Sequence, residues 1–128
     1  MTGAAPAAGT LEKTIVVADD EPGYCETIKD LLEDEGYHVE TAEDGQAALE
    51  LLRRLPRRPC LLVLDLIMPI LDGGAVYREI KADPQLAPIP VVIATSDPTR
   101  APSGATVMPK PVKLERLLEV VRRACREA

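Results

Sequence analysis

Short strand-like runs alternate with helical apolar stripes along nearly the whole chain, and this alternation constrains the fold more than any other feature. The run at 14–18 (TIVVA) is rich in β-branched residues, and apolar residues then recur at helical spacing up to Gly36. The run at 59–66 (PCLLVLDL) is continuously apolar, which is typical of a strand covered on both faces. This pattern predicts a doubly wound α/β fold with a parallel sheet and helices on both faces.

The same patterns set the expected elements. Strands are expected at 14–18, 37–42, 59–66, 90–95 and 105–108, and helices at 24–36, 44–55, 73–83 and 112–127. In folds of this kind the functional crevice lies beyond the carboxyl ends of the parallel strands. The residues that directly follow each strand therefore carry the functional argument.

The segment between the fourth and fifth strands is unusually short. Lys110 follows Thr95 by only fifteen positions, and the fifth strand occupies part of that interval. The remaining residues, 96–105 (SDPTRAPSGA), include two prolines and a glycine, which do not sustain even a two-turn helix. We therefore expect the helix at this point, the fourth in a regular alternation, to be absent or reduced to a turn.

Length and charge restrict the classes of partner. The chain has 128 residues, enough for one domain, and we expect a disordered tail at 1–13 followed by a single folded domain at 14–128. Its net charge of −6 argues against a nucleic-acid or anionic membrane surface, and the end of the chain lacks a basic or helix-turn-helix segment. No apolar run approaches the roughly 18 residues of a membrane span. We expect a cytoplasmic protein without nucleic-acid or membrane partners.

The three cysteines, Cys25, Cys60 and Cys125, are odd in number and lie far apart within apolar patterns. Buried free thiols fit this distribution better than a disulfide framework or a metal site. We therefore expect all three to be free.

Charged and hydroxyl residues follow four of the predicted strands. Asp19 and Asp20 follow the first strand, Asp65 the third, Thr95 the fourth and Lys110 the fifth. If these strands are neighbours, three carboxylates converge with one hydroxyl and one ammonium group. Taken singly, each residue also has a structural interpretation, such as a helix cap for Asp20 or a solvated loop position for Lys110.

Clustered carboxylates repel one another unless a cation neutralises them. A ligand set made only of oxygen atoms is typical of a hard ion, and Mg²⁺ fits because it leaves a coordination position for phosphate. In such a site Asp65 would attack a phosphoryl group as the nucleophile. The metal, Thr95 and Lys110 would then each stabilise one of the equatorial oxygens.

Four segments in this order, VADDEP, LVLDLIMPILDGG, IPVVIATS and MPKP, resemble the receiver domain of two-component response regulators. The resemblance extends over about 14–127. It implies a flavodoxin-like five-stranded sheet of order 2-1-3-4-5, in which Asp65 is phosphorylated by a histidine kinase or a phosphotransfer protein. It also implies that Asp20, Asp65 and the backbone carbonyl of Ile67 hold Mg²⁺, and that Asp19 acts mainly through water. By the same resemblance Thr95 and Lys110 bond the phosphoryl group.

The chain departs from this family in two places. The fourth helix is expected to be reduced or absent, and the position of the family's aromatic switch residue is Val107, in a chain without Phe or Trp. Both changes fall on the surface through which many receivers bind their targets. We therefore expect an unidentified downstream protein to be contacted through the loop after the fourth strand or through the first helix.

Two other functional classes stay open. A pseudo-receiver would be an interaction module that works without phosphorylation, although the full set of acids, hydroxyl and lysine argues against it. An enzyme or cofactor carrier on a similar fold is the third class. A flavodoxin-like carrier would need a phosphate-binding loop where this chain has acids, and a haloacid-dehalogenase-type phosphatase would need an acid where it has Ile67. We expect no enzymatic activity beyond the domain's own phosphorylation and dephosphorylation.

Overall fold

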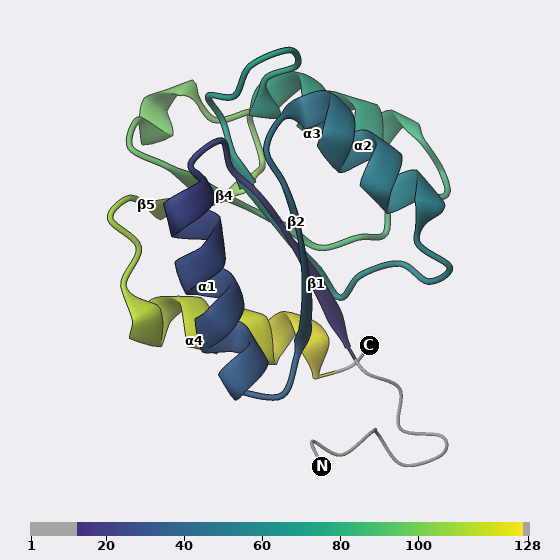
Figure 1. Cartoon of the computed structure of the whole chain (residues 1–128). Coiled ribbons are helices and arrows are strands. Elements are labelled where there is room, and N and C mark those ends of the chain that lie inside the picture. The colour runs from purple at the N-terminus through teal and green to yellow at the C-terminus, as the bar shows by residue number, and fades with distance from the viewer. Residues whose placement is uncertain (1–12, 127–128) are drawn as a thin grey trace.

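A single parallel sheet forms the centre of the molecule (Figure 1). The computed structural model describes residues 13–126, so the predicted tail lies almost entirely outside the described residues. The strands follow the order β2-β1-β3-β4-β5, as predicted. Their bounds are β1 (Thr14–Ala18), β2 (His38–Ala42), β3 (Leu61–Asp65), β4 (Val91–Thr95) and β5 (Thr106–Pro109).

Helices cover both faces of the sheet. They are α1 (Pro22–Asp34), α2 (Gly45–Arg54), α3 (Gly73–Ala82) and α4 (Leu114–Cys125). Buried side chains of α1 and α4 pack in one apolar cluster and those of α2 and α3 in another, on opposite sides of the strands. Within 13–126 no helix combines the length and the apolar character that crossing a membrane requires.

The central strand β3 is buried along its whole length, as its continuous apolar sequence predicts. Side chains alternate between the two clusters, so that Leu62 and Leu64 face α2 and α3 while Leu61 and Val63 face α1 and α4. This burial on both faces fixes the register of β3 against β1 and β4. It thereby fixes the position of Asp65 at the strand's carboxyl end.

The connection between β4 and β5 contains one short 3-10 turn, η1 (Pro98–Arg100), and no α-helix. The chain does have a fourth α-helix, α4, but this helix follows β5. Ala101 and Ala105 of this connection pack against the apolar cluster of α2 and α3, so the loop itself covers part of the sheet there. The structure thus agrees with the prediction of a helix reduced to a turn at this point.

The prediction of three free cysteines is wrong for two of them. Cys60 and Cys125 form a disulfide, whereas Cys25 is free and buried. Cys60 directly precedes β3 and Cys125 ends α4, and both lie in the cluster between α4 and the sheet. Their separation of 65 positions in the sequence hides this proximity, which arises only from the packing of α4.

The entry into α3 depends on a residue without a side chain. A Cβ atom at Gly73 would lie 2.0 Å from the carbonyl oxygen of Asp65. The amide of Gly73 donates a 2.7 Å hydrogen bond to the carbonyl of Leu66, and Asp72 caps the helix by accepting from the amide of Ala75. Only glycine therefore lets α3 start this close to the end of β3.

We predict that Gly73→Ala lowers the free energy of unfolding by about 1–3 kcal/mol, because the added methyl group displaces the backbone at Asp65. Gly23→Ala is the matched control, since nothing lies within 4 Å of its Cβ position in α1. This control should keep or gain stability, by up to about 1 kcal/mol from helix propensity. Urea denaturation checks both variants, and equal stability of Gly73→Ala and the wild type would contradict the packing argument.

Reduction of the disulfide should destabilise the protein. Closing a loop of 65 positions restricts the unfolded chain, and this effect is worth about 4 kcal/mol by chain-entropy arguments. Dithiothreitol should therefore lower the melting temperature of the oxidised wild type and leave that of Cys60→Ser unchanged. An equal response of the two proteins to dithiothreitol would contradict the assigned bond.

Candidate functional site

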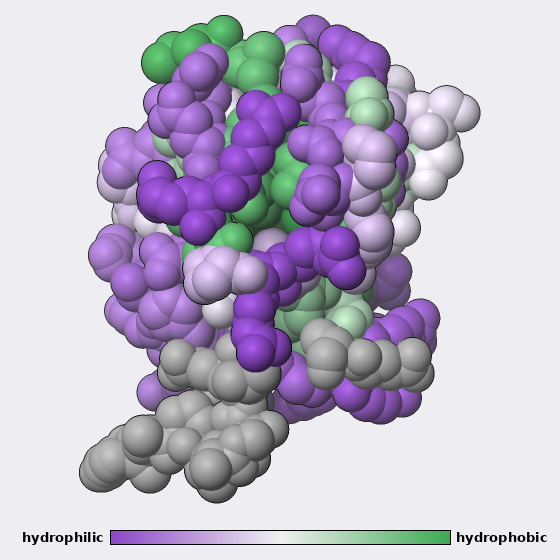
Figure 2. Space-filling model, turned by 90° about the vertical axis from the view of Figure 1, so that its right-hand side faces the viewer, coloured by the Kyte–Doolittle hydropathy of each residue, from purple (hydrophilic) through white to green (hydrophobic). Residues whose placement is uncertain are grey.

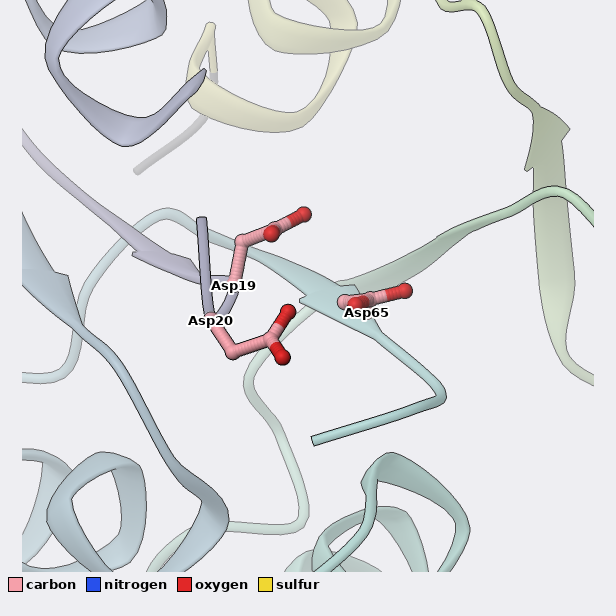
Figure 3. Close-up of side chains that lie close together, drawn as sticks. All are labelled: Asp19, Asp20 and Asp65. Carbon is pink, nitrogen blue, oxygen red and sulfur yellow. The ribbon is translucent and has the colours of Figure 1, made fainter. Parts of the chain in front are cut away.

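Four strands deliver the predicted site residues to one edge of the sheet. Asp19 directly follows β1, Asp65 ends β3, Thr95 ends β4 and Lys110 directly follows β5. Figure 3 shows the carboxylates of Asp19, Asp20 and Asp65 gathered at this edge, where β1 and β3 end side by side. One oxygen of each of these three carboxylates lies within 4.8 Å of the others.

Asp19 is the most deeply buried of the three acids, with only 2% of its surface exposed. Its amide donates to the carbonyl of Ala42, and its Oδ1 accepts the amide of Glu21 at 3.0 Å. Its Oδ2 accepts the ammonium of Lys110 at 2.6 Å. Asp20, by contrast, is exposed to solvent.

Lys110 reaches into the site from the end of the edge strand β5. Its Nζ lies 2.6 Å from Asp19 and 3.6 Å from the Oδ1 of Asp65. The same ammonium lies 4.7 Å from the centre of the Tyr24 ring, a cation–π contact. Its amide donates to the carbonyl of Thr95 at 2.8 Å, and the bond to Pro111 is cis. The lysine is therefore fixed at both its backbone and its charged end.

Thr95 is almost completely buried, at 1% exposure. Strand register pairs Asp65 with Ala94, which places Thr95 one position beyond the partner of Asp65 on the neighbouring strand. The Thr95 Oγ1 accepts the amide of Asp97 at 3.0 Å. The hydroxyl thus links the end of β4 to the loop that carries η1.

The surroundings of Asp65 disfavour the ionised form of its carboxyl group. Burial raises the pKa of the Asp65 carboxyl, and the charge of Asp19 raises it further, while Lys110 and the amide of Ile67 act in the opposite direction. Burial alone would lower the pKa of Lys110, but its bond to Asp19 and the charge of Asp65 raise it overall. The cluster therefore contains one ammonium group and three carboxylates, so negative charge is in excess.

The structure brings Asp19, Asp20, Asp65 and Lys110 into one cluster and places Thr95 on the adjacent strand end. Ile67 contacts the Asp65 carboxylate through its amide, and its side chain is 55% exposed. The Ile67 carbonyl, which the resemblance assigns to the metal, stays a prediction.

Sequence reasoning missed two residues that shape the site. Tyr24 lies under the ammonium of Lys110, and Gly73 allows α3 to approach the backbone of Asp65. The paired glycines after Asp72 were a visible signal for such a close approach. The position of Tyr24 in the first turn of α1 gave no signal for its contact with a residue 86 positions later.

Comparison with known proteins agrees with this geometry. Residues 15–122 match the model of the response regulator receiver domain. The chain belongs to this family. Members are signalling proteins of two-component systems, and the chain is accordingly the receiver domain of a response regulator.

Individual relatives support the same assignment. Response regulator MprA of Mycobacterium leprae (strain TN) is 37% identical over 113 residues, which cover 84% of this chain and 49% of that protein. The chain thus spans about half the length of the curated relatives it matches.

Among solved structures, the receiver domain of a signal transduction histidine kinase from Syntrophus aciditrophicus superposes with a TM-score of 0.79 at 31% identity, covering 91% of this chain and 92% of that one. A receiver domain protein from Clostridium thermocellum gives 0.79 at 30% identity, covering 90% and 95%.

The repulsion at Asp65 predicts a dependence of stability on pH. Because the pKa of Asp65 is raised in the folded state, its contribution to stability is complete at low pH and is lost as the pH rises through the folded value. Without divalent cations, Asp65→Asn should therefore be more stable than the wild type at pH 7. The difference should shrink as the pH falls below the ordinary range of a carboxyl group.

Urea denaturation in EDTA across this pH range checks the prediction. Asp30→Asn removes the same charge from an exposed position on α1 and should change stability by less than about 0.5 kcal/mol. An Asp65→Asn protein that is less stable than the wild type at pH 7 would contradict the account of the site.

Proposed function

We propose that the domain accepts a phosphoryl group on Asp65 from a histidine kinase or a phosphotransfer protein, and that phosphorylation changes its binding to a downstream protein. One observation carries the proposal. A carboxylate at the end of the central strand lies 3.6 Å from a fixed ammonium and clusters with two further acids. This arrangement concentrates the groups that phosphoryl transfer to a carboxylate requires.

The acidic cluster fits a magnesium ion. Its ligands are all oxygen atoms, they lie within 4.8 Å of one another, and one of the acids, Asp20, is exposed for entry of the ion. Asp20, Asp65 and the carbonyl of Ile67 would hold the ion directly, and Asp19 would act through water. When bound, the ion supplies positive charge that offsets the repulsion among the carboxylates and the charge on the phosphoryl oxygens.

In the transfer step, a carboxylate oxygen of Asp65 attacks the phosphorus of a phosphohistidine. The new P–O bond forms while the P–N bond breaks, and the electron pair of the broken bond stays on the imidazole nitrogen. Lys110 is placed to stabilise one phosphoryl oxygen because its Nζ already lies beside Asp65. The Thr95 hydroxyl, on the adjacent strand end, would bond another oxygen.

We also propose a cytoplasmic location, because histidine kinases form phosphohistidine from ATP inside the cell. Disulfides are rare in the cytosol. The Cys60–Cys125 disulfide of the structure would face reducing conditions there.

We predict that the protein gains the mass of one phosphoryl group when it is incubated with acetyl phosphate and Mg²⁺. Asp65→Asn should gain none, and EDTA should prevent the gain in the wild type, because both the nucleophile and the neutralising charge are needed. Intact-mass spectrometry measures the product. Asp30→Asn is the matched control and should be phosphorylated like the wild type.

Absence of phosphorylation in a folded wild type would contradict the proposal. Such a result would favour a pseudo-receiver, whose partner binds regardless of phosphate. Equal phosphorylation of Asp65→Asn and wild type would show that another residue accepts the phosphoryl group.

A further inference from the structure

A groove of about 420 Å³ lies beside the proposed phosphorylation site, on the side where the usual fourth helix of the family is replaced by η1. The loop after β3 contributes Ile67 and Met68, α3 contributes Arg78, and η1 contributes Arg100. Three segments that converge on the same strand ends therefore form its walls.

Exposed apolar side chains lie on the loop after β3, which forms one wall of this groove. Ile67 is 55% exposed, and Ile70, in the same loop, is 77% exposed. Figure 2 shows apolar surface at the top of the molecule, where Figure 1 places the loop that leads into α3. Ile67, which lines the groove, and Ile70, three positions later, therefore offer apolar side chains to a partner at this edge.

The backbone of Ile70 strengthens this interpretation. Its φ angle is 71°, in the left-handed region that β-branched residues rarely adopt. Glycine or asparagine would be more stable at such a position, and the isoleucine side chain gains nothing from burial there. Strain of this kind is concentrated at functional sites, so the residue fits a role in binding better than a role in folding.

The charge of the groove is opposite to that of the rest of the chain. Arg78 and Arg100 are exposed and, within residues 13–126, neither forms an ion pair, although the chain as a whole carries −6. The only acid in the groove wall is Asp72, whose Oδ1 accepts the amide of Ala75 as the cap of α3. Two free guanidinium groups beside apolar side chains complement carboxylates that flank an apolar side chain.

The groove is also connected to the site through hydrogen bonds. Thr95 Oγ1 accepts the amide of Asp97, and the carbonyl of Asp97 accepts the amide of Arg100 at 3.1 Å. The Thr99 hydroxyl donates to the Asp97 carboxylate at 2.5 Å. A shift of the Thr95 side chain toward a phosphoryl group that lengthens its bond to Asp97 would loosen the loop that carries Arg100.

We propose that this groove binds an acidic segment of a downstream protein, with an apolar side chain seated against Ile67 and Ile70 and carboxylates paired with Arg78 and Arg100. Phosphorylation of Asp65 strengthens binding, because Thr95 then releases η1 and Arg100 closes on the segment. This effect of phosphorylation on binding rests on the function proposed above. The surface lies between the loop after β3, α3 and η1, and it needs no fourth helix.

A display library of short random peptides, selected against the protein in acetyl phosphate and Mg²⁺, tests the proposal. The enriched peptides should carry acidic residues around an apolar one. In fluorescence anisotropy, Arg78→Glu and Arg100→Glu should each weaken their binding by about tenfold or more. Arg57→Glu makes the same charge change at an exposed position outside the groove and should leave binding unchanged.

Ile70→Asn separates binding from folding. This variant should keep or gain stability in urea, because asparagine tolerates the left-handed backbone, and should still lose peptide affinity. Selected peptides without acidic residues, or equal losses for Arg57→Glu and Arg100→Glu, would overturn the proposal. Self-association that disappears in Arg78→Glu would also overturn it, in favour of a second copy of the chain as the occupant.

Intact-mass spectrometry of the same samples distinguishes this inference from the proposed function. Phosphorylation should raise the affinity of the wild type for the selected peptides by about tenfold. The substitution Thr95→Ala should abolish this gain. A phosphorylated wild type with unchanged affinity would overturn the coupling alone. A wild type that is not phosphorylated would overturn the proposed function together with the coupling, while the effects of Arg78→Glu and Arg100→Glu would still decide whether the groove binds.

Discussion

The buried ion pair between Lys110 and Asp19 is the interaction on which the rest of the site depends. Asp19 is 2% exposed and accepts the lysine at 2.6 Å, and a carboxylate buried this deeply needs such a partner. The pair also joins the end of β1 to the residue after β5, across the strands that carry Asp65 and Thr95. The proposed phosphoryl chemistry would therefore use a charge that the fold already requires.

One ammonium does not balance three carboxylates, and this imbalance explains how the site can respond to ligands. Burial and the charge of Asp19 disfavour the ionised form of Asp65, and a bound cation would offset this repulsion. The stable parts of the fold, β3 above all, hold Asp65 in place. The loops at the same edge carry the left-handed Ile70 and the short turn η1, and they are the parts that the proposed coupling would rearrange.

Much of the fold and of the site could be predicted from the sequence, because both follow local patterns. The apolar run that ends in Asp65 fixes a central strand, and parallel strands bring their carboxyl ends together. Three features depended on packing between distant residues and were not predictable in this way. They are the disulfide of Cys60 with Cys125, the position of Tyr24 under Lys110, and the convergence of Arg78 and Arg100 on one groove.

The most direct test of the account is the effect of Mg²⁺ on stability, measured by urea denaturation of the wild type, Asp20→Asn and Asp30→Asn. Asp20 is exposed, so its replacement leaves the packing intact while it removes one oxygen ligand from the cluster. We expect rising Mg²⁺ to stabilise the wild type and Asp30→Asn progressively, and Asp20→Asn much less. Equal stabilisation of all three proteins, or no response to Mg²⁺ in the wild type, would contradict the claim that the acidic cluster is a cation site.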